Sequence, residues 1–234
     1  MENIRDRRAL LCLELEKAST FMIVNYEQIV AFWQQLEQTL DQLLDSQNDT
    51  YFDADLLLDH YRDILHKIDR NLTFHFEREE GEGPVEMVFG CDGYPESIHS
   101  VLSLISAAPA LRGIEFRAFN DRCDPVPSCV NLGDEECRIE DYWCSLRLIE
   151  GRLQLAVYMD ALPEVLEMDA RVEAVMIFLD AIIGEFEIMT RIWSLDWFEI
   201  PADPLDFGLI PLEELRNAFD KIKDSVKPLG ITLH

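Results

Sequence analysis

Basic residues are scarce in this 234-residue chain, where 20 Lys and Arg stand against 46 Asp and Glu for a formal net charge of −26. Affinity for nucleic acids comes largely from counterion release by Lys and Arg, so this charge excludes DNA or RNA as an expected partner. Anionic membrane surfaces are disfavoured for the same reason. Basic proteins and small cations remain compatible with such a surface.

Long apolar runs and a secretory signal are also missing. The segment Met1–Arg8 is charged, and no run of apolar residues approaches the roughly 20 needed to span a bilayer. We therefore expect no membrane association and a cytoplasmic location. The six cysteines form no CxxC pair, and the widely spaced Cys123, Cys129, Cys137 and Cys144 do not fit a zinc ribbon. Free thiols without a bound metal are expected.

Motifs of the readily recognised enzymes are absent as well. The chain has no GxSxG, no GxxxxGK[ST], no GxGxxG that opens a helix and no HExxH. These absences exclude the common hydrolases and nucleotide-binding folds and imply no cofactor. They favour a non-enzymatic protein, and an enzyme with unfamiliar machinery stays open as an alternative.

What the sequence does contain is a clear alternation of helical and strand patterns. Hydrophobic residues make up 48% of the chain, as in a folded protein. Apolar spacing predicts helices over 25–44, 53–68, 95–108, 169–183 and 211–226, and strands over 72–77, 85–89, 113–119, 142–149, 152–159 and 193–200. Residues 120–141 have no regular pattern, and residues 1–24 fit either a strand or a helix.

This order of elements predicts an α+β fold, with a single mainly antiparallel sheet and helices on one face or at its ends. Nothing marks a firm boundary between domains, so we expect one domain over residues 1–234. Residues 1–24 could form a peripheral N-terminal segment of that domain.

Three short stretches carry a resemblance to known proteins. Leu65–Phe74 (LHKIDRNLTF), Ala107–Phe119 (AAPALRGIEFRAF) and Leu179–Glu185 (LDAIIGE) together resemble a group of uncharacterised bacterial cytosolic α+β proteins, through short "AAPxLxG" and "LDxxxGE" patterns. The resemblance covers residues 27–220 in outline. It implies the order of elements given above and assigns no catalytic residue.

Acidic side chains gather in two connections of the predicted fold. Glu77, Glu79, Glu80 and Glu82 crowd the first, and Asp134, Glu135 and Glu136 crowd the second. Like charges at such density repel one another, and a cationic partner would relieve that repulsion. The leading hypothesis is therefore an acidic interaction protein that binds a basic protein, as an immunity protein, an antitoxin or a chaperone would. A purely solubilising role for the charge is the alternative.

A second hypothesis places a ligand pocket in the last third of the chain. Trp193 and Trp197 share one face of a predicted strand, and Glu185 follows an apolar helix, where it could be partly buried. Such residues would suit a small-ligand binder or an enzyme with an aromatic pocket and a buried carboxylate. The same residues also fit a strand packed on the core and a carboxylate that bonds to backbone at a helix end.

Overall fold

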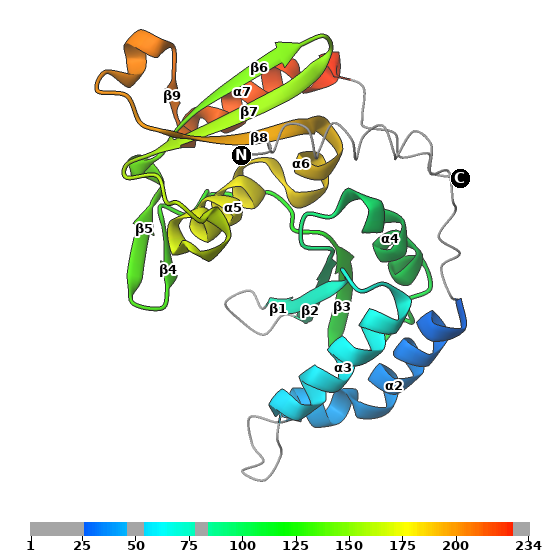
Figure 1. Cartoon of the computed structure of the whole chain (residues 1–234). Coiled ribbons are helices and arrows are strands. Elements are labelled where there is room, and N and C mark those ends of the chain that lie inside the picture. Colours follow the sequence, from blue (N-terminus) through cyan, green and yellow to red (C-terminus); the bar gives the residue numbers. More distant parts are fainter. Residues whose placement is uncertain (1–25, 46–53, 78–83, 227–234) are drawn as a thin grey trace.

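Helices and strands of the first half of the chain enclose one hydrophobic core (Figure 1). We describe residues 26–45, 54–77 and 84–226 from a computed structural model. The first-half elements are α2 (Tyr26–Asp45), α3 (Ala54–Ile68), β1 (Thr73–Glu77), β2 (Val85–Gly90), α4 (Ile98–Ser106) and β3 (Ile114–Ala118). The helical spacing of Ile29, Trp33 and Leu36 predicted one apolar face on α2, and all three side chains are buried. Trp33 Nε1 also donates to the carbonyl of Leu104 in α4, at 3.0 Å.

The sheet of the first half combines two kinds of pairing. Strands β1 and β2 form the predicted antiparallel hairpin, with Phe74 opposite Phe89. Strand β3 instead pairs parallel to β2, and α4 makes the crossover between them. Parallel neighbours need such a crossover, since a tight turn reverses the chain.

The second half encloses a separate hydrophobic core. Its elements are β4 (Cys129–Leu132), β5 (Glu135–Arg138), β6 (Trp143–Ile149), β7 (Arg152–Met159), α5 (Ala170–Ile183), α6 (Glu185–Arg191), β8 (Ile192–Glu199), β9 (Ile210–Pro211) and α7 (Leu215–Ile222). Four of these strands form a sheet in the order β8-β7-β6-β9, and β4 pairs with β5 in a hairpin of its own. Strands β7 and β8 are parallel, with α5 and α6 as the crossover.

The α+β class is confirmed, but the prediction of a single sheet is wrong. The described residues form three sheets, of three, two and four strands. Apolar alternation locates strands but does not encode their partners, and here two cores each gather their own strands. Residues 120–141, predicted to be irregular, contain β4 and β5. Residues 1–24 lie outside the described part of the chain, and a single domain over 1–234 stays a prediction.

Helix α6 lies where the two cores meet. Met189 and Phe186 pack against the first core, whereas Ile188 packs against the second. The apolar spacing along the chain did not reveal this helix, because its seven residues make only two turns. Its position makes the end of α5 and the start of α6 the natural place for a cavity between the halves.

Candidate functional site

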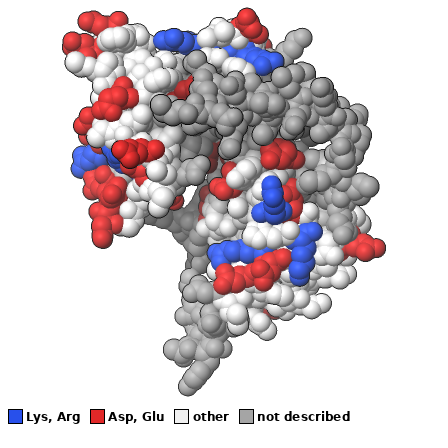
Figure 2. Space-filling view, in the orientation of Figure 1, with Lys and Arg blue, Asp and Glu red and all other residues white. Residues whose placement is uncertain are grey.

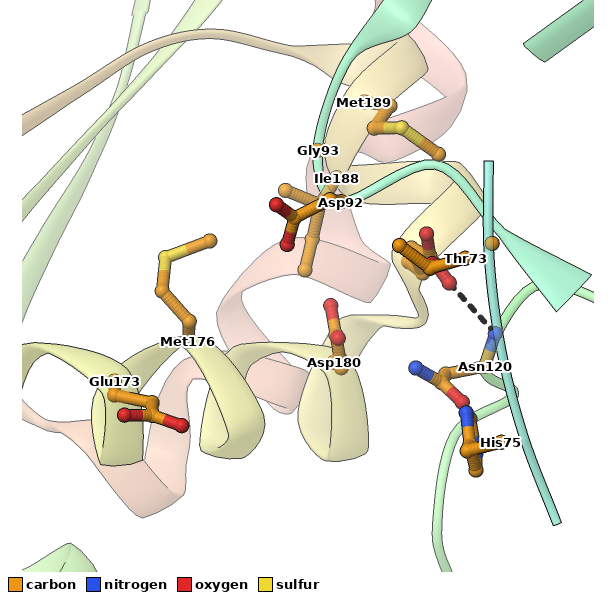
Figure 3. A pocket seen from close by; sticks show the side chains of 12 residues that line it. Thr73, His75, Asp92, Gly93, Asn120, Glu173, Met176, Asp180, Ile188 and Met189 are labelled. Carbon is orange, nitrogen blue, oxygen red and sulfur yellow. Dashed lines mark hydrogen bonds between the residues drawn. The ribbon is translucent and has the colours of Figure 1, made fainter. Parts of the chain in front are cut away.

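A cavity of about 360 Å³ opens between the two halves, within the usual size range of ligand pockets. The lining comes from strand β1, the end of β2 and the turn after it, Asn120 two residues after β3, and helices α5 and α6. Four lining residues are carboxylates: Asp92, Glu173, Asp180 and Glu185. Figure 3 shows Asp92 and Asp180 on facing sides of the cavity, with Glu173 farther along the helix that carries Asp180.

The bend at Gly184 brings two of these carboxylates together. Gly184 ends α5 with a φ of +95°, a conformation that L side chains rarely adopt, and its N–H donates to the carbonyl of Asp180 at 2.8 Å. Asp180 therefore stands in the last turn of α5, and Glu185 is the first residue of α6. Both side chains reach the same cavity from either side of one glycine.

Glu185 is the most deeply buried of the four carboxylates, at 7% exposure. Its Oε1 accepts from the N–H of Cys91 at 3.3 Å, and its Oε2 accepts from the N–H of Asn120 at 3.0 Å. The chain passes close by, since a Cβ on Gly90 would lie 2.8 Å from Oε1. Burial raises the pKa of Glu185, while the two backbone N–H groups and the nearby His75 act in the opposite direction.

The pKa of Asp180 is raised as well. Burial and the negative charge of Glu185 raise the pKa of Asp180 to about 7, and a hydrogen bond with the side chain of Asn120 opposes the shift. Among the described residues, no Lys, Arg or His forms an ion pair with Asp180 or Glu185. The cavity therefore has a buried acidic end at which the described residues form no ion pair.

The rest of the cavity wall is mixed, because Thr73, His75 and Asn120 contribute polar groups and three other side chains are apolar. Met176 of α5 and Ile188 and Met189 of α6 line it beside the carboxylates (Figure 3). A ligand in this space would meet negative charge at some points and methyl or thioether groups at others. That combination suits a molecule with an aliphatic body and a positively charged group.

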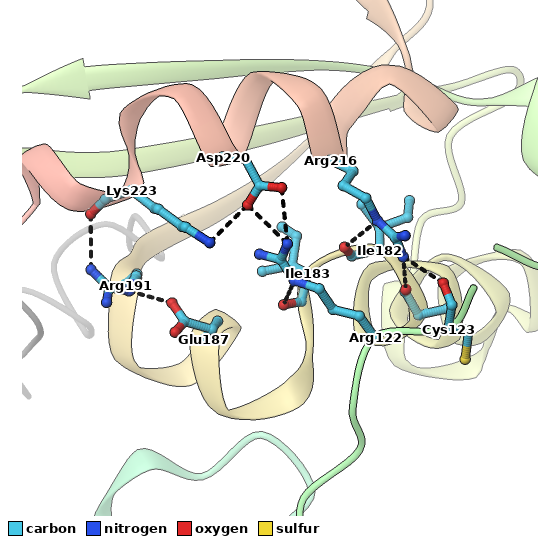
Figure 4. A network of polar contacts seen from close by, with 10 residues as sticks. Arg122, Cys123, Ile182, Ile183, Glu187, Arg191, Arg216, Asp220 and Lys223 are labelled. Atoms are coloured by element: carbon cyan, nitrogen blue, oxygen red, sulfur yellow. Dashed lines mark hydrogen bonds and ion pairs between the residues drawn. The ribbon is translucent and has the colours of Figure 1, made fainter. Parts of the chain in front are cut away.

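Two arginines bind the backbone at the end of α5 (Figure 4). Arg122 Nε donates to the carbonyl of Ile183 at 2.8 Å, and its Nη1 binds Asp220 of α7 at the same distance. Arg216 Nε donates to the carbonyl of Ile182 at 3.2 Å. Cationic groups at a helix C-terminus satisfy its free carbonyls and complement its dipole. The guanidinium groups thus hold the α5–α6 junction in place without forming ion pairs with the cavity carboxylates.

The sequence-predicted pocket residues do not come together. Glu185 lies in the cavity, as a buried carboxylate, but neither Trp193 nor Trp197 lines it. The ring of Trp193 stacks beneath the guanidinium of Arg152, at 5.0 Å from the ring centroid, and Trp197 packs against the second core. This cavity therefore contains Glu185 without either tryptophan, and a separate ligand pocket around Trp193 and Trp197 stays a prediction.

The predicted acidic clusters have different surroundings. Glu77 is half-exposed and forms an ion pair with Arg117. Glu79, Glu80 and Glu82 lie outside the described residues. In the second cluster, Asp134, Glu135 and Glu136 are all exposed on the β4–β5 hairpin. Figure 2 shows carboxylate atoms gathered over this hairpin, at the left of the view.

Several cavity residues, among them Thr73, Asn120 and Asp180, were missed from the sequence. Thr73 belongs to the first stretch that carries the resemblance, Asn120 directly follows the second, and Asp180 and Glu185 are the two acidic residues of the third. The three stretches therefore end at one cavity. His75 directly follows the first stretch.

Comparisons with protein-family models, with curated proteins and with solved structures found no match to this chain. The described residues include no group of three or more His, Cys, Asp or Glu side chains arranged to hold a metal ion. No helix in the described ranges is long and apolar enough to cross a membrane.

Proposed function

We propose that this protein binds a small, positively charged organic ligand in the cavity between its two halves. The observation that carries this proposal is the pair Asp180 and Glu185, which reach one cavity from either side of Gly184 with no ion-pair partner among the described residues. Burying a carboxylate costs free energy that hydrogen bonds, protonation or pairing with a cation can offset, and the two backbone N–H bonds of Glu185 supply only the first of these. A cationic ligand would restore that pairing.

A protonated Asp180 gives this binding a characteristic pH dependence. Because the pKa of Asp180 is raised to about 7, a proton occupies the carboxyl below that pH and competes with a cation. Affinity for an amine should be highest above pH 7 and about tenfold weaker at pH 6 than at pH 8. The amine must stay protonated over this range, which aliphatic amines do.

Calorimetry with n-butylamine tests the proposal directly. We expect n-butylamine to bind the full chain at pH 8, and butyrate, which carries the opposite charge, not to bind. Asp180→Asn should weaken amine binding at least about tenfold and flatten its pH dependence. Asp134→Asn, on the exposed β4–β5 hairpin, makes the same change in net charge and should leave binding unaltered. Equal losses in both variants would refute a specific site.

The β4–β5 hairpin supports a second candidate function, which is the docking of a basic protein. The hairpin extends at the edge of the second half (Figure 1) and exposes Asp134, Glu135 and Glu136. Arg138 pairs with Glu136 and offsets only part of this charge.

An oligolysine probe distinguishes this candidate from general attraction to an acidic protein. Binding at low salt should weaken more for the Asp134→Lys, Glu135→Lys variant than for the matched Asp203→Lys, Asp206→Lys variant on another exposed loop. Equal losses in the two variants would show that only the total charge matters.

A further inference from the structure

Helix α5 carries a second carboxylate, Glu173, at a distance from the pair Asp180 and Glu185. Glu173, Met176 and Asp180 all line the cavity, at spacings of three and four residues that put them on the same side of the helix. The seven residues from Glu173 to Asp180 correspond to about 10 Å along the helix axis. Negative charge therefore occurs at both ends of this stretch, with a methionine between them.

The two ends differ in their exposure. Glu173 is exposed, whereas Asp180 is half-buried and its neighbour Glu185 is more than nine-tenths buried, with no ion-pair partner among the described residues. The cavity thus has an acidic mouth and an acidic interior. A ligand with one cationic group would satisfy only one of these two ends.

Three apolar side chains line the cavity beside these carboxylates. They are Met176 from α5 and Ile188 and Met189 from α6 (Figure 3). Methylene groups gain free energy from contact with such side chains. An aliphatic chain between two cationic groups would therefore find apolar contacts in this space.

From this arrangement we propose that the ligand is a linear aliphatic diamine. One ammonium group binds Asp180 and Glu185 at the interior end, the chain lies across Met176, Ile188 and Met189, and the second ammonium group reaches Glu173. This inference rests on the proposed function, because it specifies which cation occupies the same cavity.

Calorimetry with two matched series of ligands tests the inference at pH 8 and constant ionic strength. The probes are diaminobutane, diaminohexane and diaminooctane, each compared with the monoamine of equal chain length. The best diamine should bind about fivefold tighter than its monoamine, as suits an added ion pair at an exposed carboxylate. Affinity should pass through a maximum with chain length, since only one length spans the two ends.

Variants at the two ends separate the inference from the proposal on which it rests. Glu173→Gln should reduce diamine binding to the monoamine level and leave monoamine binding unchanged, while Asp180→Asn should weaken both. Asp134→Asn is the control of equal charge. If diamines and monoamines bind equally and Glu173→Gln has no effect, the diamine inference is overturned and amine binding stands. If no amine binds the unmodified protein, the proposed function itself fails.

Discussion

Replacement of Asp180 by Asn should stabilise this protein above neutral pH. Asparagine keeps the shape of the side chain and its capacity to bond with Asn120, but it removes a charge from the interior end of the cavity. In the unmodified protein the pKa of Asp180 rises from 3.8 to about 7 on folding, so the folded state holds this proton more tightly than the unfolded chain. The free energy of unfolding therefore falls as the pH rises from about 4 to about 7.

The size of this effect follows from the shift in pKa. A change from 3.8 to about 7 corresponds to about 4 kcal/mol of lost stability at full ionisation, and screening by water in the open cavity reduces it to about half. Asp180→Asn should recover about 2–4 kcal/mol at pH 8. This gain in stability should be about 1.5–3 kcal/mol smaller at pH 5 than at pH 8, because at pH 5 Asp180 of the folded unmodified protein already carries the proton.

Urea denaturation between pH 5 and pH 8 at constant ionic strength measures both quantities. Any lost carboxylate relieves repulsion in a chain with a net charge of −26, so Asp134→Asn serves as the control for that general effect. Glu185, Asp92, Glu173 and His75 are the other titratable residues that line the same cavity as Asp180. If Asp180→Asn lowers stability at every pH, or matches the control at pH 8, then Asp180 is ionised in a favourable setting and the reasoning is wrong.

Three further predictions concern the surroundings of the cavity. Gly90→Ala should lower the free energy of unfolding by about 1–3 kcal/mol, because the new methyl group meets the Glu185 carboxylate. In a Glu185→Ala background most of this loss should disappear, and urea denaturation measures both. Arg216→Met should lower the free energy of unfolding by about 2–4 kcal/mol in the same assay, since several carbonyls near the end of α5 lose a charged donor. A loss below about 0.5 kcal/mol, as for an ordinary surface substitution, would contradict this. Labelling of the native protein with a thiol reagent, followed by peptide mapping, should modify the exposed Cys123 and Cys129 before the buried cysteines of the described chain, and early modification of a buried cysteine would contradict the packing.

Local features of the sequence were sufficient for many of the elements. The predicted pair of strands over 142–149 and 152–159 is present as β6 and β7, because Glu150 and Gly151 both take positive φ values and close a tight turn. The long apolar helix ends at Gly184 as expected, and the Asp169 side chain caps its start by accepting from the N–H of Arg171. Turns and helix caps are formed by residues only a few positions apart, so the sequence alone predicts them.

The candidate site could be predicted only in part. Glu185 was singled out because a carboxylate that follows an apolar helix has a good chance of burial, and it is indeed buried. The hypothesis that combined it with Trp193 and Trp197 depended on closeness in sequence, which does not fix the direction of a side chain. The partners that the structure gives it, Cys91 and Asn120, lie 94 and 65 residues away in the chain.

The sequence alone therefore determined the acidic character of the molecule, its α+β class and the boundaries of most helices and strands, because charge, period and capping are properties of neighbouring residues. Only the tertiary structure decided that the described strands divide among three sheets, that β2–β3 and β7–β8 are parallel, and that four carboxylates from α5, α6 and the turn after β2 line one cavity. Those outcomes depend on contacts between residues far apart in the chain, which two hydrophobic cores bring together and which no local pattern encodes.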